Sequence, residues 1–167
     1  MNTVKLVAVA ACALLLLAAC KNASDETRLK RREVLYHFNP IAGDCVALFG
    51  EGAVRKSTPA QVLADLSERL DNLAYIGIEN DAMHIDLPWP YDDIDVPVKI
   101  EKNDDALRIN GIHGKIALSF TAYALDGQNT VLRLDGKFCH PMPRLLKENV
   151  LANCIKNIVK KIRKARD

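Results

Sequence analysis

The chain has 167 residues, of which 49% are hydrophobic and 26% are charged, and its formal net charge is +2 at pH 7. These values are ordinary for a globular protein, and the sequence has no internal repeats or low-complexity stretches, which excludes a repeat array. The charges are distributed unevenly. Residues 28–32 and the C-terminal end are basic, whereas residues 79–105 are rich in Asp and Glu.

The N-terminus has the parts of an export signal. Lys5 gives a positive start, residues 6–17 form an apolar run, and Leu17-Ala18-Ala19-Cys20 follows. This tetrapeptide resembles the lipobox of bacterial lipoproteins, in which the cysteine receives a diacylglyceryl group and a signal peptidase cuts before it. Even when it is extended to the cysteine, the apolar run is about 15 residues, shorter than the roughly 20 of a membrane-spanning helix. We therefore expect a signal peptide over residues 1–19 and lipidation of Cys20; the alternative is a secretory signal without lipid.

The lipobox resemblance implies a location for the mature protein. Acyl chains on Cys20 would hold it on a membrane, and Lys21 stands where inner-membrane retention in enteric-type bacteria usually shows Asp. We expect anchoring in the outer membrane, facing the periplasm, where nucleic acid is not an expected partner. Residues 20–31 have almost no apolar side chains and predict a flexible tether with a reach of about 35 Å. One domain, residues 32–167, follows the tether.

Three cysteines remain in the mature domain after lipidation, Cys45, Cys139 and Cys154. An oxidising compartment favours one disulfide and one buried thiol. The pairing of Cys45 with Cys139 is the first interpretation and that of Cys139 with Cys154 an alternative. No CxxC spacing is present, so the sequence indicates neither a redox enzyme nor a zinc cluster.

The first half of the domain begins with short strands. The pattern predicts a strand over residues 33–38 and a second over residues 45–49, which we expect Gly50 and Gly52 to break. A helix should begin at Ser57-Thr58-Pro59-Ala60-Gln61, because it offers a hydroxyl cap, proline at the first helical position and glutamine three residues after threonine. Its apolar face is the set Val62, Leu63, Leu66, Leu70 and Leu73.

The second half changes to a period of two, which is typical of half-buried antiparallel strands. Alternation is clear over residues 83–87, 96–100, 116–122 and 132–138, and residues 126–129 form the turn of the last hairpin. From Arg144 apolar residues repeat at three and four, which predicts a helix of about 22 residues, roughly 33 Å long. This helix would cover the apolar face of the sheet.

This element order is similar to the helix-grip fold of the START-like (SRPBCC) superfamily, with the likeness carried by residues 54–66 and 114–162. The fold class expected is α+β, a curved antiparallel sheet covered by the long C-terminal helix, with residues 32–49 added before the matching part. The alternative is a cystatin-like open α+β sheet. The resemblance implies an apolar cavity between sheet and helix, although the same residues would equally fill a solid core. The candidate lining residues are Ile85, Leu87, Val98, Ile100, Leu118, Phe120, Leu132, Leu134, Phe138, Ile155, Ile158 and Val159.

A second candidate site is the loop that holds the only tryptophan, Trp89, between two prolines. An aromatic side chain on a stiff loop is a good anchor for a protein partner, and the acids after it would attract a basic surface. The candidate partner-binding residues are Trp89, Tyr91, Asp92 and Asp93. The alternative is that the tryptophan tucks over the edge of the core.

Signals for catalysis are weak. His84 and Asp86 share one strand face, as a base and its orienting carboxylate would, but exposed strand positions are more often solvated. No nucleophile turn or calcium-loop spacing is present, so we expect no catalytic residue, no metal and no cofactor.

The basic C-terminal residues also have two interpretations. They suit the dipole of a solvated helix end, which we favour, or they would contact lipid phosphates. They are Lys156, Lys160, Lys161, Arg163, Lys164 and Arg166.

The sequence thus predicts a non-enzymatic binding module. The first interpretation is an envelope lipoprotein that holds a hydrophobic ligand or lipid between the sheet and the C-terminal helix. The alternative is a protein-binding lipoprotein that uses the Trp89 loop and the acidic strip formed by the acids after it. Such a protein would be either a component of an envelope assembly or an immunity or inhibitor protein.

Overall fold

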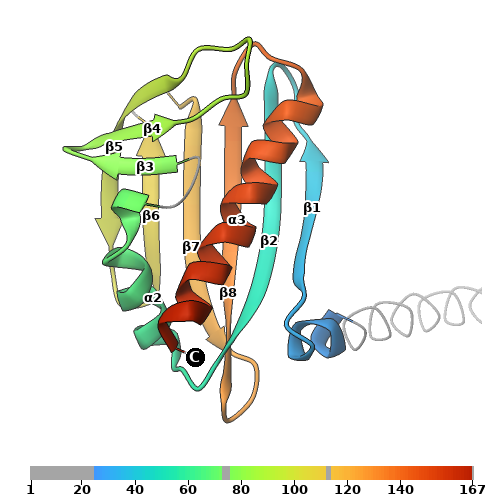
Figure 1. Cartoon of the computed structure of the whole chain (residues 1–167), viewed down its shortest axis with the longest axis vertical. Helices are drawn as coiled ribbons and strands as arrows, with labels where there is room; N and C mark the ends of the chain where they lie inside the picture. Colours follow the sequence, from blue (N-terminus) through green and yellow to red (C-terminus); the bar gives the residue numbers. More distant parts are fainter. Residues whose placement is uncertain (1–24, 73–75, 112–113, 167) are drawn as a thin grey trace, which may run out of the picture.

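The computed structural model describes residues 25–72, 76–111 and 114–166, so the expected signal peptide and Cys20 lie outside the described residues. One antiparallel sheet, in the order β1-β2-β8-β7-β6-β5-β4-β3, curves around the long helix α3, Arg144–Arg166 (Figure 1). The strands are β1 Val34–Pro40, β2 Cys45–Arg55, β3 Ile76–Glu79, β4 Ala82–Ile85, β5 Ile94–Lys102, β6 Ala106–Gly111, β7 Ile116–Ala124 and β8 Asn129–Cys139. The expected fold class is confirmed.

The hairpin of β7 and β8 forms as the alternation predicts. Its register pairs Ile116 with Phe138 and Phe120 with Leu134, so large apolar side chains lie side by side on the inner face. The carboxylate of Asp126 accepts the backbone N–H groups of residues 128 and 129 at 2.9 Å each, which closes the turn.

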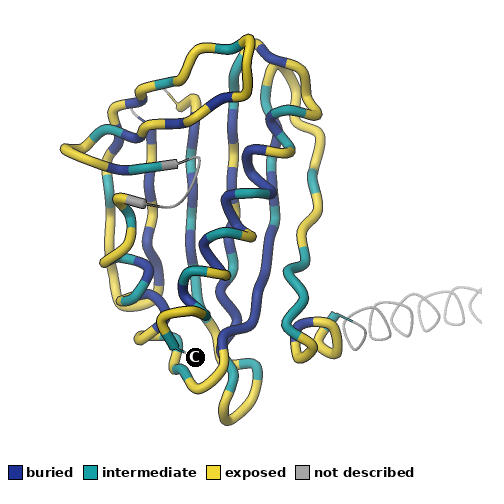
Figure 2. Tube along the Cα trace, in the orientation of Figure 1, coloured by how far each residue is buried: buried dark blue, intermediate teal, exposed yellow. Residues whose placement is uncertain are grey.

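Burial alternates along the strands and follows one side of α3 (Figure 2). The inner side chains of the sheet and the facing side chains of α3 belong to one hydrophobic cluster. This is the expected result for a one-sided sheet covered by an amphipathic helix.

Strand β2 differs from the prediction, because it runs unbroken through Gly50 and Gly52. A Cβ at Gly50 would lie 3.0 Å from Cγ1 of Ile155, and one at Gly52 would lie 2.6 Å from Cγ2 of Val159. These glycines therefore allow α3 to approach the strand backbone, which is a packing role and not a strand break.

The short helix α2, Pro59–Ser67, begins where the sequence predicts, and Thr58 and Gln61 form a reciprocal capping box. Its buried side chains are Val62, Leu63 and Leu66. The helix ends earlier than its apolar pattern suggested. A single 3-10 turn, η1 Leu70–Asn72, follows, and Leu73 lies outside the described residues.

Strand β6 has no counterpart among the expected strands. It alternates buried Leu107 and Ile109 with exposed Arg108 and Asn110, and it pairs with both β5 and β7. Only five or six residues carry this alternation, and a run of that length is weak evidence in a sequence.

The expected flexible tether is also wrong over part of its length. Residues 25–30 form a helix, and Leu29, 3% exposed, packs against Ala53 and Val131 on the outer face of the sheet. Residues 25–30 therefore belong to the folded part, because Leu29 has an apolar surface to cover. None of the described helices is long and apolar enough to cross a membrane.

Candidate functional site

The predicted cavity residues all lie between the sheet and α3, where they form part of a single packed cluster. Eleven of the twelve are buried and Ile100, at the edge, is partly buried. Phe120, Leu132 and Leu134 are 0% exposed and belong to the same cluster as Ile155 and Ile158 of α3. These side chains pack against one another, and their role in lining a ligand cavity stays a prediction.

A pocket of about 310 Å³ opens at one edge of this core. One wall is the segment after β4, with Asp86, Leu87 and Pro88, and the other is the first half of α3. The residues that α3 contributes are Leu146, Asn149, Val150 and Asn153. Leu87 and Val150 are 9% and 5% exposed, so the floor of the pocket is apolar and reaches the core. We call this depression the mouth.

The loop beside the mouth is held by its own hydrogen bonds. The Leu87 N–H donates to the Asp93 carboxylate at 2.9 Å, and the Tyr91 N–H donates to the Pro88 carbonyl at 3.2 Å. Tyr91 is half-buried against the core. Asp93 and Tyr91 therefore stabilise the loop in addition to their predicted role in partner binding.

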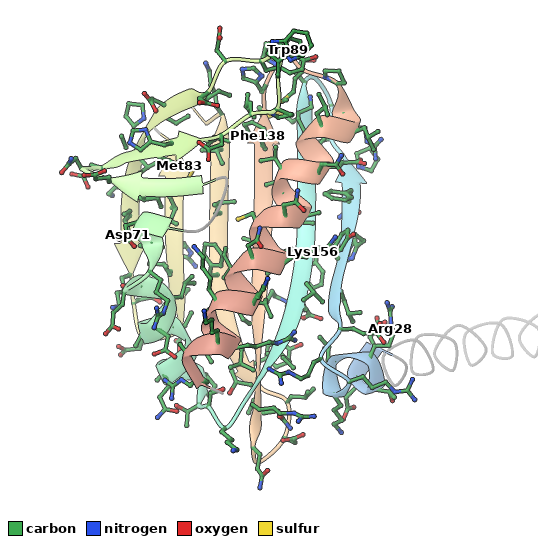
Figure 3. The ribbon with its side chains drawn as sticks, in the orientation of Figure 1. Arg28, Asp71, Met83, Trp89, Phe138 and Lys156 are labelled. Carbon is green, nitrogen blue, oxygen red and sulfur yellow. A yellow bond between two sulfur atoms is a disulfide. The ribbon has the colours of Figure 1, made fainter. Side chains whose placement is uncertain are left out.

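Trp89 projects from this loop with 92% of its surface exposed. It lies at the opposite end of the molecule from Arg28 (Figure 3). The alternative that it tucks over the core is wrong. Asp92 is exposed beside it, so the loop presents an aromatic ring with a neighbouring negative charge to solvent.

The disulfide joins Cys45 to Cys139, as the first interpretation predicts, and the two residues are direct partners in the register of β2 and β8. Cys154 remains a free thiol in the core, where burial raises its pKa to about 12. Cys154 is therefore protonated at neutral pH and is a poor nucleophile.

A buried lysine ties α3 to the disulfide end. The Lys147 ammonium, 3% exposed, donates to the carbonyl oxygens of Asp44 at 2.8 Å and His140 at 3.0 Å. Burial, followed by the charges of Lys115 and Lys147, lowers the pKa of His140, so its ring is neutral at pH 7. The first turns of α3, which form one wall of the mouth, are fixed by these bonds.

The side chain that His84 contacts is that of Asp95 and not that of Asp86, with which it shares a predicted strand face. His84 Nδ1 contacts Asp95 Oδ1 across β4 and β5, and both side chains are largely exposed. A cross-strand contact between exposed side chains is common on the outer face of a sheet. Among the described residues, no group of three or more His, Cys, Asp or Glu side chains is placed to hold a metal ion.

Sequence reasoning missed a polar cluster on the outer face. The carboxylate of Glu51, 8% exposed as a residue, accepts a hydrogen bond from Tyr123 at 2.9 Å and pairs with Arg133 at 3.0 Å. The Arg133 guanidinium also lies 4.5 Å from the centroid of Phe49. Residues Glu51 and Arg133 are opposite each other in the register of two strands far apart in the chain, which no local pattern reveals.

No protein-family model matches the chain, and no curated protein matches its sequence. Solved structures do match. A STAR-related lipid transfer protein from Xanthomonas axonopodis is 13% identical, with a TM-score of 0.57 over 79% of this chain and 92% of that chain. The KanY protein is 11% identical, with a TM-score of 0.53 over 69% of this chain and 94% of that chain. The chain has the helix-grip fold. At these identities the likeness establishes the architecture.

Proposed function

We propose that this protein is a lipoprotein of the bacterial cell envelope, anchored by acyl chains on Cys20 in the outer membrane and facing the periplasm. It acts as a non-catalytic module that binds a hydrophobic ligand or lipid between the sheet and α3. The observation that carries the proposal is the mouth, whose apolar floor of Leu87 and Val150 continues into the core. The lipid-transfer name of the Xanthomonas neighbour supports the same ligand class.

The mouth suits a small apolar molecule or the end of an acyl chain. Its volume of about 310 Å³ is at the small end of ligand pockets, which are typically about 300–1,000 Å³. The floor would supply the affinity through burial of apolar area, and the amides of Asn149 and Asn153 would orient a polar group at the rim. A longer ligand would have to displace side chains that now pack against one another.

The test uses the mature chain carrying Cys20→Ser, purified without detergent and studied by native mass spectrometry and solvent extraction. We expect a ligand in near-stoichiometric amount. Asn149→Trp, at the rim, should reduce its occupancy about tenfold by filling the mouth, whereas Asn149→Ala should retain it. A bare mass for the parent protein, with no apolar ligand taken up on titration, would rule out this function.

A second candidate function is protein binding, which the 92% exposure of Trp89 favours. Partner anchors are often rigid aromatic side chains, and the exposed acid Asp92 follows this ring in the same loop. The partner would be a basic surface on an envelope component or on a toxin that an immunity protein neutralises. If the mass is bare, a pull-down that captures a partner with the parent protein and loses it with Trp89→Ala would favour this alternative.

A further inference from the structure

A second depression, of about 500 Å³, is lined by four cationic residues, Arg32, Lys160, Arg163 and Lys164. Arg32 follows the helix of residues 25–30, and the other three lie on the last turns of α3. Among the residues that the structure describes, no acidic side chain lines it. We call it the basic pocket. A site of this composition selects an anion, because positive charges that converge in one pocket raise the local potential.

Arg163 holds the two walls of the basic pocket together. Its guanidinium donates from Nε to the Ala53 carbonyl at 2.8 Å and from Nη1 to the Arg32 carbonyl at 2.9 Å. These bonds join α3 to β2 and to the residue that leaves the N-terminal helix. The pocket is therefore a fixed junction of three segments.

The lysines of the pocket are available to a ligand. Lys160 and Lys164 are exposed, and neither has an acidic partner among the described residues. They stand four residues apart on α3, and like charges at this spacing repel each other on a helix. A bound anion would remove this repulsion. Lys156, one turn before Lys160, adds a third lysine at the same four-residue spacing. Its Nζ lies 4.7 Å from the ring centroid of Tyr36.

Arg32 occupies a backbone position that usually belongs to glycine. Its φ is 68°, and the N–H groups of Arg32 and Glu33 close the preceding helix on the carbonyls of Leu29 and Arg28. Glycine is the preferred residue at this position of the closing motif. Arg32, in this left-handed conformation, ends the N-terminal segment at the basic pocket, which its side chain lines.

Three acids of the N-terminal segment pair with cations outside the pocket. Asp25 and Glu33 pair with Arg28, and Glu26 pairs with Lys30. The dipole of α3 favours cations in the last turn of that helix, and Arg32 comes to the same pocket from another segment.

The position of the pocket in the fold indicates the source of the anion. Cys20 lies five residues before the start of the helix of residues 25–30, and five residues reach at most about 18 Å. The helix is fixed to the domain through Leu29, so the chain cannot hold this end far from an anchored cysteine. Trp89 lies at the other end of the molecule (Figure 3), with exposed Asp92 beside it.

We infer that the basic pocket docks on the phosphate headgroups of the membrane that carries the anchor, and that the Trp89 end faces away from it. The orientation and the choice of membrane phosphate as the anion rest on the proposed lipidation of Cys20. Anion binding by the pocket does not, since the pocket belongs to the folded domain. The proposed ligand mouth, beside the Trp89 loop, would then open into the periplasm and away from the bilayer.

The first test measures binding of the unlipidated mature chain, Cys20→Ser, to vesicles of phosphatidylcholine with about 30% phosphatidylglycerol. We expect binding that high salt removes and that pure phosphatidylcholine vesicles do not show. Lys160→Gln with Lys164→Gln should weaken the partition coefficient about 25-fold, or about fivefold per charge. The matched control, Lys115→Gln with Lys137→Gln, removes the same charge elsewhere and should change it less than about twofold.

Three results would overturn docking by the basic pocket. They are equal losses in the two double variants, binding that ignores the anionic lipid, and saturation of the pocket by inorganic phosphate without vesicle binding. None depends on whether Cys20 is lipidated or the mouth holds a ligand, so failure here is separate from failure of the proposed function.

The second test reads orientation from the fluorescence of the single tryptophan. Brominated lipid should leave Trp89 emission unchanged when the protein binds anionic vesicles. In a Trp89→Phe background, a tryptophan introduced by Ala165→Trp, close to the basic pocket, should be quenched. Quenching of Trp89 with no quenching of the second reporter would reverse the orientation.

Discussion

Glu51 is a carboxylate almost removed from water on the outer face of a sheet, and its two partners explain how it is accommodated. Tyr123 donates to it and Arg133 pairs with it, while the guanidinium also lies over Phe49. A buried acid without such partners would be strongly destabilising. Because Arg133 retains 40% of its side-chain exposure, the charge pair itself adds only modestly to stability.

The phenol of Tyr123 reports on this cluster. Burial, and then the hydrogen bond to Glu51, raise the pKa of Tyr123 to about 12. Between pH 10 and about 12 the unfolded chain releases this proton and the folded protein keeps it, so the free energy of unfolding falls as the pH rises through this window. We expect an ultraviolet titration of the folded protein to show one tyrosine that deprotonates late, near pH 12. This late step should be absent from Tyr123→Phe and retained in the control Tyr36→Phe. A late step that survives in Tyr123→Phe would contradict the assignment.

Individual site residues were predictable only in part. The spacing of Leu118, Phe120 and Leu134 placed these side chains on one face correctly, because period-two alternation is a direct consequence of strand geometry. It could not tell a packed core from a cavity, since both need the same apolar faces. The sequence also did not show that Asp93 would turn back to the Leu87 N–H while Trp89 projects into solvent. That difference depends on the path of the loop.

At the level of elements, the close contact between β2 and α3 depends on two missing side chains. The helix approaches the strand through Gly50 and Gly52, where Ile155 and Val159 occupy the space of a Cβ. Residues with side chains would hold α3 away from the sheet and open gaps in the core. The two glycines that led us to expect a strand break thus lie inside a continuous strand and permit this close approach.

Gly52→Ala should destabilise the protein by about 1–3 kcal/mol, the usual effect of overpacking. The new methyl group would lie 2.6 Å from Val159 Cγ2, so either the side chain or α3 has to move. Adding Val159→Ala should recover part of the loss. Urea unfolding measures both effects, and Gly127→Ala is the control, since no atom lies within 4 Å of its Cβ. A neutral Gly52→Ala would show that α3 does not depend on this contact.

Elements with strong local signals were predicted well. Three elements carry their sequence signature within one continuous stretch of the chain: the capping box of α2, the β7–β8 hairpin and the 23-residue α3. The errors fall where tertiary contacts decide the outcome. Strand β6 needs β5 and β7 on either side, and the helix of residues 25–30 rests on Leu29 meeting Ala53 and Val131. Neither of these contacts is visible in a local window.

In the whole molecule, the disulfide cross-links strands β2 and β8 at the end opposite the basic pocket. It links the first residue of β2 to the last residue of β8, and the buried ammonium of Lys147 lies over the same junction. Two distant parts of the chain and the start of α3 are thus fastened together. The end near the N-terminal helix is joined by Arg163 instead.

Removal of the Cys45–Cys139 disulfide should lower the free energy of unfolding more than Gly52→Ala does. The bridge spans 94 residues, and in the chain-entropy model a loop of that size contributes about 4 kcal/mol by restricting the unfolded chain. Cys45→Ala with Cys139→Ala should lower the free energy of unfolding by about that amount, measured in urea. Cys154→Ala, which removes a buried thiol but no cross-link, should cost only about 1 kcal/mol. Reduction should destabilise the parent protein and leave the double variant unchanged; equal sensitivity of the two would mean that the bridge is not what stabilises the fold.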